Sequence, residues 1–285
     1  MTDQQRTLED AWGRQRAAGD RFAFGRNWSR FSKGLTPERI ELAQQSMVEI
    51  LGTTSLAGLR FLDAGCGSGV FSLCARRLGA EVVSFDFDPD SVQTTRRVRE
   101  QYAGDDAAWQ VHQGSVLDAE FVSSLGRFDV VYSWGVLHHT GNMSLALENA
   151  GAAVKPGGQL CISIYNDQGG VSQYWTRVKR TYNRFPALKP LIVAAHAPYL
   201  YGARAAVRML RGKRLERGMS IWYDMIDWLG GFPFEVARPE HIVRFYRQRG
   251  FDLLDMTTCG GRHGCNEFVL RRTRPLAPPP RDDVK

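Results

Sequence analysis

Three alternating glycines, Gly65, Gly67 and Gly69, are the first residues in the chain whose type and spacing could do chemistry. They stand between an apolar segment that contains Asp63 at its end and the apolar start of an expected helix. Because glycine has no side chain to hold a ligand away, the backbone of such a loop can approach a bound molecule closely. The stretch therefore predicts a cradle for a small molecule.

The loop differs from the fingerprint that binds dinucleotides, because Val70 stands where that fingerprint has its last glycine. A carboxylate at Asp63 would repel a phosphate but would attract an ammonium group. Asp86 ends a second apolar segment 21 residues after Gly65 and is placed to accept hydrogen bonds from ribose hydroxyls. These features favour a nucleotide that carries an amino acid over NAD.

Two short segments together resemble a known family. FLDAGCGSG at residues 61–69 and VVSFD at residues 82–86 are similar to the first two motifs of class I S-adenosylmethionine-dependent methyltransferases, especially the small-molecule branch that includes the ubiquinone-type O-methyltransferases. The resemblance covers residues 55–165 strongly and residues 238–272 in outline. It implies S-adenosylmethionine as cofactor, and the residues expected to bind it are Asp63, Gly65, Cys66, Gly67, Gly69, Asp86, Phe87, Ser115, Val116 and Ser133.

The adenine end of the expected cofactor site departs from the family at one position. Ser115 replaces an aspartate whose carboxylate commonly contacts the adenine amino group in the resembled family. A serine hydroxyl can accept the same hydrogen bond, and the backbone at Val116 can also contact adenine. Phe87 could stack on the adenine ring, although a place in the core would suit this side chain as well.

Methyl transfer from a sulfonium is an in-line displacement, so the protein must align the acceptor and, for a hydroxyl, accept its proton. The resemblance implies that His139, or its neighbour His138, is the base. The alternative is that His139 caps the following helix or holds the loop. His263, on a short connection near the end of the chain, and Asp224, in an aromatic run, are the other candidates.

The segment YSWGVLHHTGN at residues 132–142 is informative by what it lacks. It has no Asn/Asp-Pro-Pro-Tyr motif of the kind that enzymes methylating nucleic-acid bases place here, and no cluster of carboxylates that could hold a divalent ion. Cys259, His263 and Cys265 supply only three soft ligands and fall short of a zinc site. We therefore expect no metal and no nucleic-acid partner, and a small-molecule acceptor.

The elements that must position these residues alternate as in a parallel sheet covered on both faces. We predict strands near 60–63, 81–86, 109–113, 128–133 and 158–165, and helices near 69–79, 90–103, 118–124 and 143–154, the last ended by Lys155-Pro156-Gly157-Gly158. A helix at 239–249 and two strands at 251–259 and 265–273 follow. The expected fold is α/β, a doubly wound Rossmann-like seven-stranded sheet with an antiparallel final hairpin.

We expect one methyltransferase domain over residues 1–285. Its predicted parts are an N-terminal helical segment (1–54), a cofactor-binding core (55–165), an insertion (166–236), the C-terminal part of the core (237–272) and a tail (273–285). The insertion follows the carboxyl end of the fifth strand, where ligands bind in open parallel sheets. We call residues 166–236 the cap segment and expect them to cover the acceptor site.

Composition agrees with a folded protein, since 43% of the 285 residues are hydrophobic and five scattered cysteines make no secreted disulfide framework. No signal peptide and no membrane span are expected, so we predict a cytoplasmic protein. The net charge of +7 is uneven, because residues 168–217 hold eleven Arg or Lys and one acid. This charge favours contact with a membrane surface or an anionic substrate, or else a solvated helical face.

The sequence thus predicts transfer of a methyl group from S-adenosylmethionine, to an oxygen of a small metabolite. Methylation of nitrogen, sulfur or a peptide carboxylate remains open, as does a protein that binds S-adenosylmethionine without catalysis and acts as a partner through its basic insertion.

Overall fold

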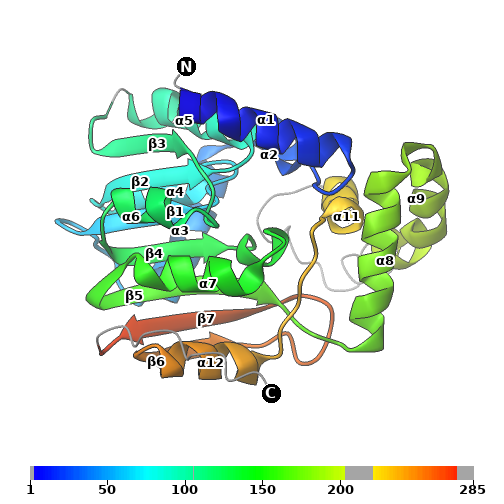
Figure 1. Cartoon of the computed structure of the whole chain (residues 1–285). Coiled ribbons are helices and arrows are strands. Elements are labelled where there is room, and N and C mark those ends of the chain that lie inside the picture. Colours follow the sequence, from blue (N-terminus) through cyan, green and yellow to red (C-terminus); the bar gives the residue numbers. More distant parts are fainter. Residues whose placement is uncertain (1–2, 105, 203–220, 275–285) are drawn as a thin grey trace.

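The computed structural model describes residues 3–104, 106–202 and 221–274 and contains one seven-stranded sheet with helices around it (Figure 1). The strands are β1 (Arg60–Ala64), β2 (Glu81–Asp86), β3 (Trp109–Gln113), β4 (Phe128–Trp134), β5 (Val154–Tyr165), β6 (Phe251–Thr257) and β7 (Cys265–Arg272). Their order in the sheet is β3-β2-β1-β4-β5-β7-β6, and β7 runs antiparallel to both of its neighbours. The predicted fold class is confirmed.

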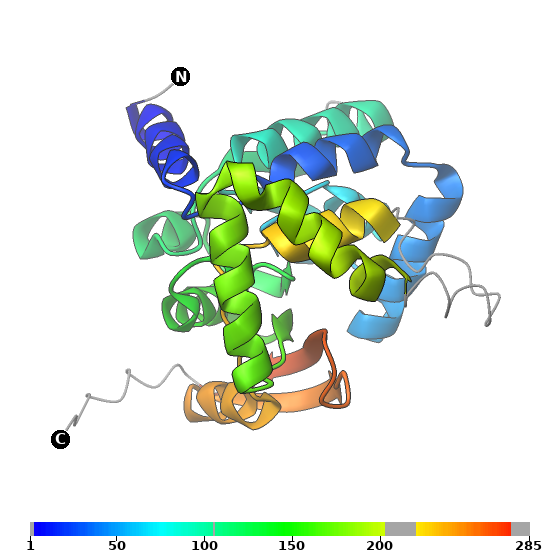
Figure 2. The same cartoon turned by 90° about the vertical axis from the view of Figure 1, so that its right-hand side faces the viewer.

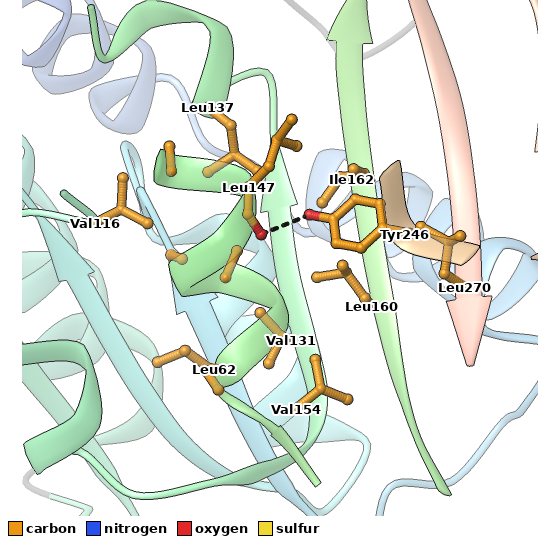
Figure 3. Close-up of a cluster of buried hydrophobic side chains, with 14 of the residues drawn as sticks. Leu62, Val116, Val131, Leu137, Leu147, Val154, Leu160, Ile162, Tyr246 and Leu270 are labelled. Atoms are coloured by element: carbon orange, nitrogen blue, oxygen red, sulfur yellow. Dashed lines mark hydrogen bonds between the residues drawn. The ribbon is translucent and has the colours of Figure 1, made fainter. Parts of the chain in front are cut away.

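One face of the sheet is covered by α6 (Ala119–Ser124), α7 (Met143–Ala152) and α12 (Pro239–Gln248). Figure 3 shows the apolar cluster on this face, in which Leu62, Val131 and Ile162 from three strands meet Leu147 of α7 and Tyr246 of α12. The Tyr246 hydroxyl donates a hydrogen bond of 2.9 Å to the Leu147 carbonyl, so its polar atom is satisfied inside the core.

The opposite face packs against α3 (Pro37–Leu51), α4 (Val70–Arg77) and α5 (Pro89–Ala103). Helix α3 begins as its sequence predicts, with the Thr36 hydroxyl accepting from the Arg39 N–H and Pro37 at the first turn. It ends at Gly52, whose φ of 67° is the left-handed conformation that glycine adopts without strain. Both faces are therefore closed, as a parallel sheet requires.

Two helices precede this core, α1 (Asp3–Ala17) and α2 (Phe24–Lys33). Helix α2 lies against α5, and Gly25 permits the contact, because a Cβ atom there would come within 2.6 Å of the Ser91 backbone nitrogen. The Gly25 N–H donates to the Asp88 carboxylate at 2.8 Å. Helix α2 is thus packed on the domain, against α5 and the turn that follows β2.

The described parts of the cap segment are helical: α8 (Gly170–Arg184), η2 (Pro186–Leu188), α9 (Lys189–Ala197), η3 (Pro198–Gly202) and α11 (Ile221–Gly230). Figures 1 and 2 show α8, α9 and α11 gathered beyond the carboxyl ends of the parallel strands, beside the N-terminal helices. The two ends of the segment meet, because Asn166 and Ala237 form an isolated parallel bridge and the Ala237 N–H donates to the Tyr165 carbonyl at 3.0 Å.

One boundary was predicted wrongly. Lys155-Pro156-Gly157-Gly158 does not end helix α7, which stops at Ala152, but lies within β5. The pairing with β4 is irregular here, passing from Phe128 opposite Val154 to Val130 opposite Gln159. Pro156 and Gly157 are exposed at this irregular entry of the strand, which is where a sheet tolerates proline and glycine.

Within residues 3–104, 106–202 and 221–274, no helix is both long enough and apolar enough to span a bilayer. The predicted tail falls almost wholly on residues 275–285, which lie outside the described part of the chain.

Candidate functional site

The glycine loop follows β1 and enters α4 as expected. The N–H groups of Gly65 and Cys66 both donate to the Phe85 carbonyl of β2, at 2.8 and 3.0 Å, which fastens the loop to the neighbouring strand. Gly65 has φ 89°, and a Cβ atom there would collide with the Val136 side chain. The loop after β1 therefore lies in direct contact with the loop after β4, and only glycine at position 65 allows the two loops to come this close.

Helix α2 covers the glycine loop. A Cβ atom on Gly67, whose φ is 53°, would lie 3.1 Å from the indole nitrogen of Trp28. Gly69 is similarly close to Thr95 of α5, and the Thr95 hydroxyl donates to the Cys66 sulfur at 3.2 Å. The N-terminal segment is therefore part of the wall around the predicted cofactor loop.

The side chain of Asp63 is buried between β1 and α4. The alternation along β1 turns its side chain toward α4, where the Ser72 hydroxyl donates to it at 2.5 Å. Only 3% of the residue is exposed, and burial raises the pKa of this carboxyl to about 6, opposed by the hydrogen bond from Ser72. A direct contact between Asp63 and a ligand ammonium stays a prediction, and the structure shows a buried carboxylate that links β1 to α4 through Ser72.

Asp86 stands at the carboxyl end of β2 and is half-buried. Its carboxylate accepts from the Gly67 N–H at 3.0 Å and from the Asp88 N–H at 2.9 Å. Burial raises the pKa of Asp86 to about 7, the charge of Asp88 adds to the rise, and the two backbone hydrogen bonds oppose it. The predicted ribose-binding acid is thus held against the glycine loop and poised to titrate near neutral pH.

Arg21, which the sequence did not single out, lies over this site. Its guanidinium carbon sits 4.9 Å from the centre of the Phe87 ring, and its nitrogens donate to the carbonyls of His139 and Thr140, both at 3.1 Å. Burial lowers the pKa of Arg21, and the charges of Asp86 and Asp88 oppose this. Arg21 therefore links the end of β2 to the loop that carries the histidines.

The other residues predicted to bind the cofactor differ in their exposure to solvent. Ser115 is half-buried and its hydroxyl accepts from the Leu117 N–H at 3.2 Å, while the carbonyl of Val116 accepts from the Asn149 amide at 2.8 Å. Ser133 is fully buried and donates to the Ala64 carbonyl at 2.7 Å, which links β4 to β1. Ser133 thus has a structural partner already, and Cys66 is buried within the loop, where burial raises the pKa of its thiol.

His139 lies on the short helix η1 (Leu137–His139) that follows β4. Its Nδ1 is 2.6 Å from the Pro233 carbonyl, and because a carbonyl only accepts, Nδ1 carries the proton and Nε2 presents a lone pair. Burial lowers the pKa of His139 to about 3, and the charges of Lys179 and Arg21 contribute. The ring is therefore neutral at physiological pH and fixed in one tautomer.

His138 is fully buried, with its ring 4.2 Å from Tyr165 and 4.4 Å from His139 between ring centres. Neither of its ring nitrogens has a hydrogen-bond partner of normal geometry in the described part of the chain. Burial lowers the pKa of His138 well below its ordinary value, the charges of His139 and Lys179 add to this, and the Ser163 backbone opposes it.

The hairpin connection and the cap segment meet at His263. Its ring centre lies 5.6 Å from that of Trp228 and 5.8 Å from that of Trp175, and the Gln168 amide donates to the Gly261 carbonyl at 2.7 Å. Trp228 also contacts Tyr165, which contacts both His138 and His139. The structure thus brings three predicted histidines to one aromatic cluster. Asp224 belongs to α11, but its side chain lies outside the described residues.

No group of three or more His, Cys, Asp or Glu side chains able to hold a metal ion occurs among the residues that the structure describes. The Cys259 thiol donates to the Arg262 carbonyl at 3.1 Å and contacts Asn266. Independence from divalent metal stays a prediction.

The comparisons with known proteins agree with this geometry. Residues 35–254 match the family described as the methyltransferase domain. A ubiquinone biosynthesis O-methyltransferase from Azorhizobium caulinodans is 31% identical over 137 residues, which cover 46% of this chain and 52% of that protein. The chain spans about half the length of the curated relatives it matches.

Two solved structures show the same fold. An O-methyltransferase family protein from Burkholderia thailandensis superposes with a TM-score of 0.52 at 15% identity, over 82% of this chain and 57% of that one. The N-methyltransferase NodS from Bradyrhizobium japonicum, in complex with S-adenosyl-l-homocysteine, gives a TM-score of 0.50 at 14% identity, over 88% of this chain and all of that one.

Proposed function

The chain belongs to the methyltransferase domain family, and from that premise we propose that it is an enzyme that transfers a methyl group from S-adenosylmethionine to an oxygen of a small molecule. The observation that carries the proposal is the half-buried Asp86 carboxylate, held by the Gly67 N–H beside a glycine loop at the carboxyl end of the parallel strands. Oxygen as the target atom is supported by the O-methyltransferase names of the curated relatives.

The residues around the loop suit this cofactor. Asp86 accepts hydrogen bonds and can take those of ribose hydroxyls, Ser115 is open enough to contact adenine, and Phe87 offers a half-buried ring at the same edge. When bound, S-adenosylmethionine supplies an electrophilic methyl carbon. The task left to this chain is to align the acceptor oxygen, exclude water and receive the proton of a hydroxyl.

His139 is the residue proposed to orient the acceptor hydroxyl. The hydrogen bond from Nδ1 to the Pro233 carbonyl leaves Nε2 as an acceptor, and Arg21 holds the backbone carbonyl of the same residue. Because burial lowers the pKa of His139 to about 3, the ring accepts a hydrogen bond well but keeps a proton poorly. His139 thus aligns the hydroxyl, and His138, His263 and Asp224 remain secondary candidates.

Calorimetric titration with S-adenosylhomocysteine and, separately, with NAD tests the cofactor assignment. Binding of the first and no heat from the second is expected, because the loop lacks the last glycine of the dinucleotide fingerprint. The reverse result would contradict the proposal. Incubation with labelled S-adenosylmethionine and a metabolite extract separates an enzyme from a protein that binds without turnover. Fragmentation of the product in a mass spectrometer, which locates the added methyl group, then separates an O-methyltransferase from an N-methyltransferase.

We further propose that the cap segment meets anionic lipid surfaces. Its described part exposes the apolar residues Phe185, Leu188, Leu191 and Tyr199 within fifteen positions, and Leu191 is 67% exposed. Arg177, Arg180 and Arg184 on α8 are exposed as well. An apolar face with basic neighbours suits the headgroup boundary of a membrane. The stripe Arg204, Arg208 and Arg211, predicted from the sequence, lies outside the described residues.

We expect the protein to sediment with vesicles that contain phosphatidylglycerol and not with pure phosphatidylcholine. Leu191→Gln should weaken this binding, and replacing Arg204, Arg208 and Arg211 by Gln should weaken it by about fivefold for each charge that lies at the surface. Leu42→Gln is the matched control, because Leu42 is 55% exposed on α3. If all variants sediment like the wild type, the exposed face of the cap segment has no lipid role.

A further inference from the structure

Lys179 occupies an unusual place on α8. Trp175, Lys179 and Tyr182 follow at spacings of four and three, so they share one face of the helix, and all three are buried. The face belongs to the apolar cluster that α8 forms with α11, in which Trp228 and Leu229 are buried. A lysine in the middle of an apolar stripe is costly, and such residues are rarely fully buried unless they are paired.

The Lys179 ammonium is only partly satisfied. It donates one hydrogen bond to the Trp228 carbonyl and lies 4.3 Å from the centre of the Trp228 ring and 4.7 Å from that of Phe234. An ammonium has three N–H donors, and in the described part of the chain no second acceptor takes the others. The aromatic faces attract the charge but do not replace an oxygen acceptor.

His138 supplies a second polar group near this cluster, beside the ring of Tyr165. It is fully buried, and neither ring nitrogen finds a partner of normal geometry among the described residues. The Tyr165 ring centre lies 4.2 Å from that of His138, and 5.1 and 5.3 Å from those of Phe234 and Trp228, the two rings over which Lys179 lies. Buried polar atoms without partners are rare in folded proteins, so the His138 nitrogens, near an ammonium that has one acceptor, indicate a missing polar ligand.

We propose that Lys179 and His138 form the polar end of the acceptor site and that Lys179 binds an acidic oxygen of the methyl acceptor. The site lies where the cap segment meets the carboxyl ends of β4 and β5, beside His139, which orients the reacting hydroxyl. Tyr165, Trp228 and Phe234 provide flat apolar walls, so the acceptor is a planar molecule with an ionisable oxygen. This inference names the substrate class and rests on the proposed function.

The charges around Lys179 suit this role. Burial lowers the pKa of Lys179 to about 7, and Asp227 of α11 opposes the fall. His138 and His139 on η1 are neutral at this pH, because burial lowers both of their pKa values, so Lys179 is the cation of this group. Near neutral pH, the protonated form of Lys179 can hold an anionic oxygen, and the neutral amine form can accept a hydrogen bond from a neutral hydroxyl.

Titration with 4-nitrophenol tests the proposal, because its visible absorbance reports its own ionisation. Wild-type protein should bind 4-nitrophenolate more tightly than nitrobenzene and should lower the pKa of the bound phenol, since a cation lies beside the oxygen. Lys179→Met keeps the apolar stem and removes the charge, and it should weaken nitrophenolate by about tenfold without changing the affinity for nitrobenzene.

Lys189→Met is the matched control, because Lys189 also lies over an aromatic ring of the cap segment, 5.0 Å from the centre of Tyr182, but is partly exposed. It should bind nitrophenolate like the wild type. Calorimetry with S-adenosylhomocysteine checks that Lys179→Met is folded and tests the proposed function separately. Equal binding of nitrophenolate and nitrobenzene by wild-type protein, a comparison that needs no variant, or equal losses in both lysine variants, would overturn the role of Lys179.

Discussion

His139→Ala is expected to lower turnover by about 10²- to 10⁴-fold while leaving the affinity for S-adenosylmethionine nearly unchanged. The ring is held by the 2.6 Å hydrogen bond to Pro233 and by a tilted ring contact with Phe24, so its Nε2 has one fixed direction. Loss of a group that aligns the reacting hydroxyl lowers the rate of the chemical step more than substrate binding. Turnover with a fixed acceptor, together with calorimetric cofactor affinity, measures both parts.

His241→Ala is the control for this prediction, because His241 is exposed on α12. The pH profile adds a second check. The lowered pKa of His139 keeps the ring neutral at every pH above about 3, so acid inactivation of the wild type near the ordinary histidine pKa should not come from this residue. If His139→Ala loses cofactor binding and turnover equally, the residue holds the loop and does not orient the acceptor.

The fold could be predicted from sequence because its signals are local. Apolar segments of strand length alternate with helix caps such as Thr36 and with glycine turns, and their order implies a parallel sheet. The bulge at residues 155–158 could not be foreseen, because proline and two glycines indicate a helix end equally well. Tertiary pairing with β4 decides between the two.

The candidate site could be predicted from the sequence only where a motif marks it. The glycine loop, Asp86 and His139 stand next to strand ends, so their positions follow from topology. Arg21 lies in the turn between α1 and α2, and Trp28 lies on α2, both of which precede the core. No spacing in the sequence relates them to Phe87 or Gly67. The sequence does contain a signal for Lys179, because its spacing from Trp175 and Tyr182 puts a charged residue inside an apolar helical stripe.

We expect cofactor affinity to depend more on Asp86 than on any other residue. Its carboxylate is held by the N–H groups of Gly67 and Asp88 and lies at the carboxyl end of β2, beside the half-buried ring of Phe87. If it accepts hydrogen bonds from ribose hydroxyls, these are charge-assisted and worth about 1.5 to 3 kcal/mol. Asp86→Ala should therefore weaken S-adenosylmethionine by about 10- to 100-fold, as measured by calorimetry.

We expect the same residue to make cofactor affinity depend on pH, and the direction of this dependence follows from its pKa. Burial and the charge of Asp88 raise the pKa of Asp86 to about 7, so the carboxyl gains a proton as the pH falls through neutrality and loses capacity to accept hydrogen bonds. Affinity of the wild type should fall between pH 8 and pH 6, by at most about tenfold per pH unit below the pKa. The Asp86→Asn variant should bind S-adenosylmethionine weakly, with an affinity that does not change across this pH range. The Asp255→Asn variant, an exposed control on β6, should follow the wild type. A wild-type affinity that does not change with pH, or an Asp86→Ala variant that binds normally, would place the ribose elsewhere.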